Sequence, residues 1–322
     1  MKIGFLGGGN VYAMHLARVY MAQGHECFGI GRNPMKPEPF SMGIEEKGYK
    51  YYAYHLTHEM DEALQVIYDE HPKVLINFAA QGEGAASFDR TAWRYYETNA
   101  VTLPRLVAEL PPHVRFVHIG SSEVYGSNLA PVDEKHPLNP TSPYSISKAA
   151  FDQHLMAMRD RLPVRFNIIR PSNAYAPGQQ LHRIIPRTLI CGMSGQKLKL
   201  QGGGVARKSF LHGDDLASAV MTVIDKGEIG EVYNAGPAEP TSIKRVVELC
   251  AQVIGMSPAD LYEIVEARHG EDSCYFLDSS KLMGLGWSPS VNLLGGIADM
   301  AAWVRKYLFQ LSHIDATYRL RA

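Results

Sequence analysis

The chain has 322 residues, 46% of them hydrophobic, and is therefore long enough to bury a sizeable core. Lys and Arg together number 32 and Asp and Glu 33. This balance, without a basic run, argues against a nucleic-acid surface, although a local basic pocket for a small anionic ligand is still allowed.

The cysteines are few, and the N-terminus shows no targeting signal. The four thiols, which form no C-x-x-C pair, are Cys27, Cys191, Cys250 and Cys274. This spacing favours neither a zinc site nor a disulfide framework. The N-terminus reads as a strand, and no run of about 18 apolar residues follows. We therefore expect a cytoplasmic protein with no membrane segment and no metal.

Short apolar runs alternate with longer amphipathic segments over residues 1–170, which predicts β-α units around a parallel sheet. The expected strands are 2–7, 26–31, 49–54, 73–79, 114–120 and 164–170. The expected helices are 11–23, 58–71, 88–110 and 143–161. Ser142 is the expected N-cap of the last helix, with Pro143 at its first position. The fold class is α/β, a doubly wound parallel sheet of the Rossmann type.

Beyond Arg170 the pattern changes to loops rich in Gly and Pro, with shorter elements between them. Helices are expected near 182–194, 214–225 and 242–254. We predict a dinucleotide-binding domain over 1–170 and a smaller C-terminal α/β substrate lobe over 171–322. Sheet elements from about 205–236 are expected to return to the first domain.

A glycine-rich segment joins the first strand to the first helix. In a G-x-x-G-x-x-G register it supplies Gly7, Asn10 and Ala13. Asn tolerates left-handed backbone geometry, and Ala permits close packing of helix on strand. Amides at the helix N-terminus would then hold a pyrophosphate, with Gly7, Gly9, Asn10 and Val11 as contacts. The alternative is a plain turn between strand and helix.

The second expected strand ends without the acidic residue that usually binds the ribose hydroxyls of NAD. Arg32 follows it instead. An arginine here can bind a 2′-phosphate, which favours NADP over NAD. The alternative is that Arg32 is a solvated loop residue.

Tyr144 and Lys148 lie four residues apart on the expected helix 143–161 and therefore share one face. A nearby ammonium group, together with an oxidised nicotinamide, lowers the pKa of a phenol from about 10 toward neutrality. Tyr144 can then act as a general base. Upstream, the apolar strand 114–120 is followed by Ser121, Ser122 and Glu123.

With these residues the chain resembles the extended short-chain dehydrogenase/reductase family, in particular the nucleotide-sugar epimerases and dehydratases. The resemblance runs over nearly the whole chain. Besides the glycine loop, its marks are Asn77-Phe-Ala-Ala-Gln81, Asn99, Ser121-Ser-Glu-Val-Tyr-Gly126, Ser142-Pro-Tyr-Ser-Ile-Ser-Lys148, Arg170-Pro-Ser-Asn-Ala-Tyr175, Arg207, Phe210-Leu-His-Gly-Asp-Asp215 and Arg268-His-Gly-Glu-Asp272.

The resemblance implies a role for each catalytic candidate. Tyr144 would take the proton of the sugar 4-hydroxyl while hydride leaves C4, Ser121 would hydrogen-bond the same oxygen, and Lys148 would hold the nicotinamide ribose. Glu123 matches the base that removes the C5 proton in a 4,6-dehydratase. Ser122 stands where dTDP-glucose enzymes carry Asp, so the Ser-Ser-Glu pattern is closer to GDP-mannose dehydratases. Either Ser122 through water or Glu123 itself would protonate the leaving O6.

Other positions match cofactor or substrate contacts of the family. The further cofactor contacts implied are His55, Leu56, Ala79, Ala80, Asn99 and Pro171. The substrate contacts implied are Asn173, Arg207 and Arg268, the two arginines for the diphosphate. Glu83 lies in a loop that departs from the family pattern, and it either contacts an unusual sugar group or faces solvent. Helices 88–110 and 143–161 resemble those that form the family's homodimer.

The predicted function is thus an NAD(P)-dependent nucleotide-sugar 4,6-dehydratase, in which lobe 171–322 binds a nucleotide-diphosphate sugar. The first alternative is a 4-epimerase, which needs no C5 base, with Glu123 merely paired to a neighbouring cation. The second is a non-catalytic cofactor sensor. Intact Ser121, Tyr144 and Lys148 argue against a sensor.

Overall fold

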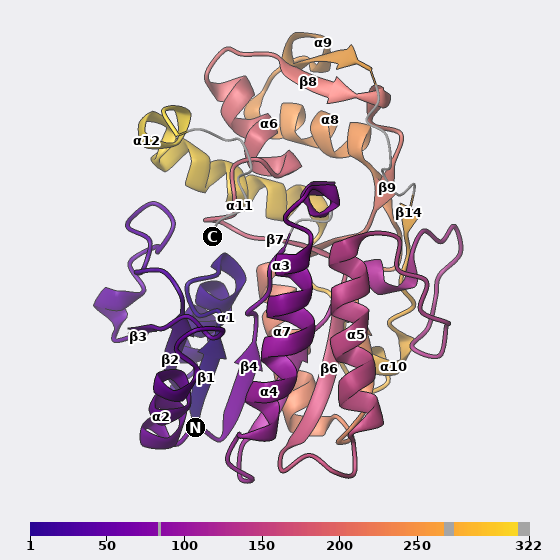
Figure 1. Cartoon of the computed structure of the whole chain (residues 1–322). Coiled ribbons are helices and arrows are strands. Elements are labelled where there is room, and N and C mark those ends of the chain that lie inside the picture. Colours follow the sequence, from indigo (N-terminus) through magenta and orange to yellow (C-terminus); the bar gives the residue numbers. More distant parts are fainter. Residues whose placement is uncertain (83–84, 267–273, 315–322) are drawn as a thin grey trace.

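The computed structural model describes residues 1–82, 85–266 and 274–314, and its centre is a seven-stranded sheet in the order β11-β6-β5-β4-β1-β2-β3 (Figure 1). Every pairing in this sheet is parallel. The strands are β1 (Lys2–Leu6), β2 (Glu26–Gly31), β3 (Lys50–Ala53), β4 (Val74–Asn77), β5 (Arg115–Ile119), β6 (Arg165–Pro171) and β11 (Val232–Ala235). The predicted doubly wound α/β fold is confirmed.

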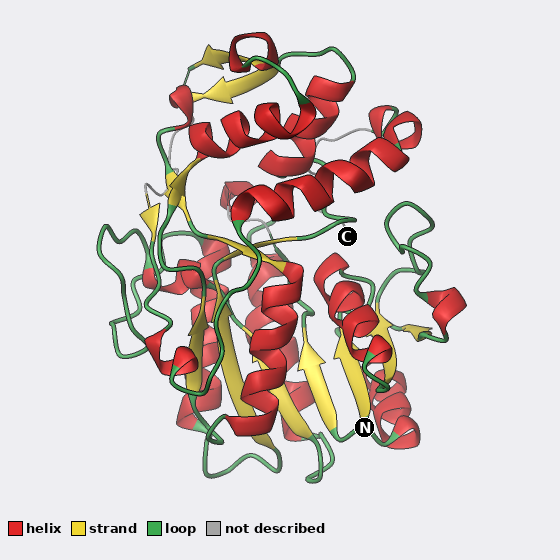
Figure 2. Cartoon of the chain, turned by 180° about the vertical axis from the view of Figure 1, so that it is seen from behind, coloured by secondary structure: helices red, strands yellow, loops and turns green. Residues whose placement is uncertain are grey.

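Helices cover both faces of the sheet, because alternate strand residues point to opposite sides. On the face turned to the viewer in Figure 1, Leu6 and Phe28 pack under α2 (Met60–Glu70), α4 (Leu103–Ala108) and α5 (Pro143–Ala157). On the face seen in Figure 2, Ile3 and Phe5 pack under α1 (Val11–Ala22) and α7 (Gly213–Lys226). Both faces of the sheet are therefore buried under helices, and the ends of its strands are held by this core.

The strand order reverses between β1 and β4, and the glycine loop crosses this point. Gly7 has φ +69°, and a Cβ there would lie 2.7 Å from the Ala79 backbone nitrogen. A Cβ on Gly8 would lie 2.4 Å from the Cα of Gly29. Asn10 does not use the left-handed geometry that we expected: its backbone is extended, and its Oδ1 accepts from the Tyr12 amide at 2.9 Å as the N-cap of α1. Capping the helix is the physical reason for an Asn at this position.

The expected helix 88–110 is divided into three parts. α3 (Trp93–Tyr96) leads into a π-helical segment, Glu97–Thr102, which leads into α4. Asn99 lies in the π segment and is fully buried. Single π turns inside helices re-aim a side chain that a regular helix would point elsewhere.

In Figure 1, a second layer of helices from the C-terminal part of the chain lies above the sheet. Its helices are α6 (Ile184–Met193), α8 (Ile243–Ile254), α9 (Pro258–Leu261), α11 (Leu293–Lys306) and α12 (Leu308–Ser312), whereas α10 (Ser280–Met283) packs beside the sheet against β11 and α7. The C-terminal part also has strands outside the main sheet. Its strands form small separate sheets, with β7 (Asn173–Tyr175), β8 (Leu198–Gln201), β9 (Arg207–Lys208), β10 (Phe210–His212), β12 (Thr241–Ser242), β13 (Tyr262–Val265) and β14 (Cys274–Tyr275). Within the described ranges, no helix is long and apolar enough to cross a bilayer.

We predict that Gly7→Ala destabilises the fold far more than Gly24→Ala. Both glycines have positive φ, +69° and +84°, so both substitutions strain the backbone. Only at Gly7 does the new Cβ meet backbone atoms, whereas nothing lies within 4 Å at Gly24. We expect losses in the free energy of unfolding of about 3 kcal/mol at Gly7 and roughly 1 kcal/mol at Gly24, measured by urea denaturation. Equal losses would show that the contact with β4 does not constrain the loop.

Candidate functional site

A cleft of about 1240 Å³ lies where the carboxyl ends of β1, β2 and β4 meet. Ligands of open α/β sheets bind at this kind of position. The lining includes most of the residues predicted to contact a cofactor, namely Gly7, Gly9, Asn10, Val11, Arg32, His55, Leu56, Ala79 and Ala80.

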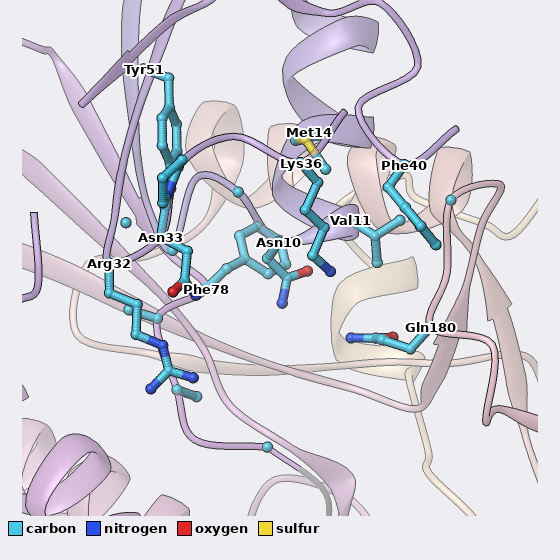
Figure 3. A pocket seen from close by; sticks show the side chains of 18 of the residues that line it. Asn10, Val11, Met14, Arg32, Asn33, Lys36, Phe40, Tyr51, Phe78 and Gln180 are labelled. Carbon is cyan, nitrogen blue, oxygen red and sulfur yellow. The ribbon is translucent and has the colours of Figure 1, made fainter. Parts of the chain in front are cut away.

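On the far side of the cleft, the loop before α6 contributes His182 and Arg183 to the lining. The sequence did not indicate three further residues there, namely Lys36 and Phe40 from the connection after β2 and Gln180 from the loop before α6. Figure 3 shows the side chains of Asn10, Lys36 and Gln180 directed into the same space. No motif marks these positions; only the crossing of the two loops over the glycine turn brings them there.

The connection after β2 is attached to the C-terminal helices. The indole Nε1 of Trp303, on α11, donates to the Pro39 carbonyl at 3.1 Å, and the rings of Phe40 and Trp303 are 6.3 Å apart. Residues about 260 positions apart in sequence thus close one wall of the cleft. A nucleotide in the cleft would be held between the sheet and this connection.

The cleft suits a dinucleotide in shape and in charge. Gly7 and Gly9 leave room that a Cβ would fill, since a Cβ on Gly9 would lie 3.0 Å from the Tyr51 hydroxyl. Arg32, Lys36 and Arg183 line the walls, and cations of this kind bind phosphate groups. Burial, and then the neighbouring His58 and Arg32, lower the pKa of His55. The residues present therefore fit a nicotinamide dinucleotide.

The serine and glutamate candidates lie directly beyond β5, in a 3-10 turn and not on the strand. Ser121 is the N-cap of the turn Ser122–Tyr125, and its Oγ accepts from the Glu123 amide at 3.2 Å. The alternation of side chains along a strand therefore does not place Ser121 and Glu123 on one face, because β5 ends at Ile119. What joins the two residues is the cap hydrogen bond. Ser121 and Ser122 are buried and Glu123 is half-buried.

Tyr144 and Lys148 lie on α5, which begins as predicted at Pro143 behind the Ser142 cap. The Tyr144 amide donates to Ser87 Oγ at 3.2 Å. Lys148 is 3% exposed, and its Nζ donates to the Ile119 carbonyl at 2.7 Å, which ties α5 to the end of β5. Burial lowers the pKa of Lys148 to about 8, and the charge of Asp152 opposes that shift.

Asn99 and Pro171 lie close to these elements but do not line the cleft as the structure describes it. The Asn99 Oδ1 accepts from the Gln81 amide at 2.9 Å, and its Nδ2 donates to the Gln81 carbonyl and to Ser147 Oγ. Pro171 is the buried last residue of β6. The five predicted catalytic residues, Ser121, Ser122, Glu123, Tyr144 and Lys148, also lie outside that lining.

The predicted substrate contacts are only partly described. Asn173 begins β7, and its backbone N–H donates to the Ser209 carbonyl at 3.0 Å. Arg207 is an exposed residue of β9, and its guanidinium donates to the Pro240 carbonyl at 3.0 Å. Glu83 and Arg268 lie outside the described residues.

Comparisons with known proteins agree with this geometry. The chain is 31% identical over 243 residues to a dTDP-D-glucose 4,6-dehydratase of Mus musculus, a match that covers 72% of this chain and 68% of the mouse protein. A crystal structure of dTDP-glucose 4,6-dehydratase from Bacillus anthracis in complex with NAD superposes with a TM-score of 0.82 at 28% identity, covering 95% of this chain and 97% of that one. The predicted dehydratase-type enzyme agrees with both.

A UDP-glucose 4-epimerase of Thermotoga maritima also superposes, with a TM-score of 0.85 over 96% of this chain and 100% of that one, but at 21% identity it supports the fold alone. Over residues 6–236 the sequence matches the model of the NAD dependent epimerase/dehydratase family. The resemblance inferred from the motifs is thus confirmed. With its doubly wound parallel sheet, its Tyr-Lys helix and this match over most of its length, the chain belongs to the NAD dependent epimerase/dehydratase family.

Proposed function

We propose that the chain is a nucleotide-sugar 4,6-dehydratase. The observation that carries this proposal is the 3-10 turn after β5, which presents a carboxylate, Glu123, two residues from the buried hydroxyl of Ser121. A 4-epimerase has no use for a base at this position. The dehydratase names of the relatives support the same choice.

In the proposed reaction the residues hold and move protons. Tyr144 takes the proton of the 4-hydroxyl, and Ser121 donates a hydrogen bond to that oxygen. A bound nicotinamide would supply the hydride acceptor for C4 and would give the hydride back at C6, while a proton exchanged with solvent returns to C5. Once C4 is a ketone, the C5 proton is acidic, and Glu123 removes it. Ser122, through water, or Glu123 then supplies the proton with which O6 leaves.

Lys148 supports Tyr144 through its charge. A buried ammonium close to a phenol stabilises the phenolate and lowers the pKa of the tyrosine. The hydrogen bond from Lys148 to the Ile119 carbonyl holds that charge at the end of β5, next to the turn that bears Ser121.

In this proposal, residues 1–170 would provide most of the cofactor contacts, and residues 171–322 would hold most of the nucleotide sugar.

The nucleotide is best sought among dTDP-, UDP- and GDP-sugars. The relatives named above carry dTDP-glucose in their names. The Ser-Ser-Glu pattern of this chain, with Ser122 in place of the Asp of that group, resembles GDP-mannose enzymes instead. Asn173, Arg207, Arg268 and Glu83 are the proposed substrate contacts.

For the cofactor we propose NADP. The structure from Bacillus anthracis contains NAD. In this chain, however, Gly31 ends β2 and is followed by Arg32, both of which line the cleft, and a guanidinium there favours a 2′-phosphate over a ribose hydroxyl.

We further propose a homodimer. Apolar side chains are exposed along one face formed by α3, the π segment and α5, with Trp93 55%, Val101 54% and Ile146 42% exposed. These elements lie together in front of the sheet in Figure 1. A second copy of the same face would cover this surface by two-fold symmetry.

The cytoplasm is the proposed compartment. The cysteines Cys27, Cys191, Cys250 and Cys274 are all free thiols. Free buried thiols persist most readily in a reducing environment.

We predict that Glu123→Gln abolishes dehydration while leaving oxidation at C4 intact, because the amide cannot take the C5 proton. Incubated in D2O with dTDP-, UDP-, GDP- and CDP-hexoses, the unmodified protein should produce a sugar that has lost water and carries deuterium at C5, as read by mass spectrometry. The variant should yield only traces of the 4-keto sugar, and the exposed control Glu109→Gln should behave as the unmodified protein. Water loss by Glu123→Gln would contradict the role of Glu123, and an inverted C4 without water loss would indicate an epimerase.

We predict that Arg32→Ser weakens NADP binding by roughly thirtyfold and leaves NAD binding nearly unchanged. The loss corresponds to about 2 kcal/mol for one charge-assisted hydrogen bond. Fluorescence titration with each reduced cofactor measures both affinities. Arg187→Ser, an exposed arginine of α6 outside the cleft, is the control. Equal affinities of the unmodified protein for the two cofactors would contradict the NADP proposal.

A further inference from the structure

A buried polar network lies around Lys148, and none of its members is among the described residues that line the cofactor cleft. Its members are Asn77 at the end of β4, His118 on β5, Asp152 on α5, Arg170 on β6 and Tyr125 in the 3-10 turn. His118 and Asp152 have no exposed surface, and Arg170 is 4% exposed. Ionisable groups this deeply buried are rare unless they compensate one another.

The amide of Asn77 determines which nitrogen of His118 carries the proton. Asn77 Oδ1 accepts from the Ala79 backbone amide at 3.0 Å, so Nδ2 is the atom that faces His118 Nδ1, at 2.9 Å. Because Nδ2 can only donate, His118 Nδ1 must accept and carries no proton. The ring is therefore neutral, with its proton on Nε2. Burial, and then the charges of Lys148 and Arg170, hold the pKa of His118 well below its ordinary value, in agreement with this tautomer.

The Nε2 atom of His118 lies between a cation and an anion. It is 3.4 Å from Lys148 Nζ and 3.5 Å from Asp152 Oδ1. Asp152 Oδ1 makes no hydrogen bond of ordinary geometry in the described structure, whereas Oδ2 accepts from Arg170 Nε at 2.8 Å. Arg170 also donates to the Tyr125 hydroxyl at 2.7 Å, and that hydroxyl donates to Asn234 at 2.9 Å.

The charges of this network do not cancel. Closest to Lys148 is neutral His118 from β5, and the charge that acts on Lys148 is that of Asp152 from its own helix. Arg170 from β6 pairs with Asp152 and with Tyr125 from the turn, and Tyr144 precedes Lys148 by one turn of α5. Lys148 and Arg170 are two cations, and Asp152 is the carboxylate among these groups. Burial by itself favours a neutral Lys148 amine. The ammonium that the proposed mechanism needs therefore depends on the charge of Asp152.

We propose that Asp152 is a positioning residue whose negative charge keeps Lys148 protonated at neutral pH, with the neutral ring of His118 between the two groups and its Nε2–H on the side of Asp152 Oδ1. The role in turnover rests on the function proposed above, whereas the charge state of Lys148 can be measured without any substrate. Asp152 contacts neither sugar nor cofactor; it acts on the reaction through Lys148.

The first test titrates Lys148 by NMR in protein labelled with ¹³C at the lysine Cε, with Lys148→Met to identify its signal. In Asp152→Asn the midpoint should fall by about one pH unit or more from its value near 8. Asp152→Glu, which restores the charge, should recover it. Asp160→Asn, an exposed acid beyond the end of the same helix, should leave it unchanged. An unchanged midpoint in folded Asp152→Asn would overturn the proposal.

Two further readouts separate a charge effect from structural loosening. Arg170→Met removes the second cation and should raise the Lys148 midpoint, opposite in sign to Asp152→Asn; a fall in both variants would contradict charge compensation. In the unmodified protein, ¹⁵N spectra of the histidines should show His118 as the Nε2–H tautomer, without titration between about pH 6 and 8. An Nδ1–H tautomer or a charged ring would overturn the proposal even if neither variant folds.

Activity follows from the same charge. Because Lys148 must be protonated, its pKa sets the alkaline limb of the rate profile, and lowering that pKa moves the limb to lower pH. Asp152→Asn should therefore lose about fivefold more activity at pH 8 than at pH 6, relative to the unmodified protein, if the midpoint falls by about one unit. If neither the unmodified protein nor any variant converts any of the nucleotide hexoses, the dehydratase proposal fails. The lysine titration still decides the role of Asp152 in that case.

Discussion

The parallel register of β1, β4, β5 and β6 is the constraint on which the rest of the site depends. Leu6 pairs with Asn77, Asn77 with His118, and Ile119 with Ile169. Because all these strands run in the same direction, their carboxyl ends meet at one edge of the sheet. The glycine loop, the Ser-Ser-Glu turn and the polar network around Lys148 all begin within a few residues of that edge. A slip of one residue would turn His118 from α5 to the opposite face.

The candidate site has two parts. The cofactor cleft lies over β1, β2 and β4, whereas the catalytic candidates lie over β5 on the turn and on α5. Within the second part, Lys148 ties α5 to the end of β5 by donating to the Ile119 carbonyl, and the proposed chemistry uses its buried charge. Burial strengthens the electrostatic effect of that charge on the pKa of a neighbouring phenol. Burial also raises the desolvation free energy of the ammonium itself. The protonation state of Lys148 therefore depends on Asp152 and Arg170 as well as on Tyr144.

The π segment illustrates how local irregularity serves the same end. A regular helix would direct the Asn99 side chain elsewhere. In the π segment, its amide makes hydrogen bonds with the main-chain N–H and C=O of Gln81 and with the Ser147 hydroxyl. It thereby fastens the loop after β4 to α5. Family resemblance marked Asn99 as important, but periodicity predicted an unbroken helix from 88 to 110, because a single extra residue per turn leaves almost no trace in the apolar pattern.

The sequence by itself determined the fold class, the order of strands and helices over 1–170, the glycine loop and the Tyr-Lys helix. These follow from local signals: apolar periodicity, the Ser142-Pro143 start and glycines where a Cβ has no room. Tertiary structure alone decided the rest. The wall of the cleft built from Lys36 and Gln180 and the tautomer of His118 both arise from residues far apart in the chain that strand register and loop crossing bring together. Such contacts carry no periodicity, because they depend on where two backbones meet and not on the pattern along either one.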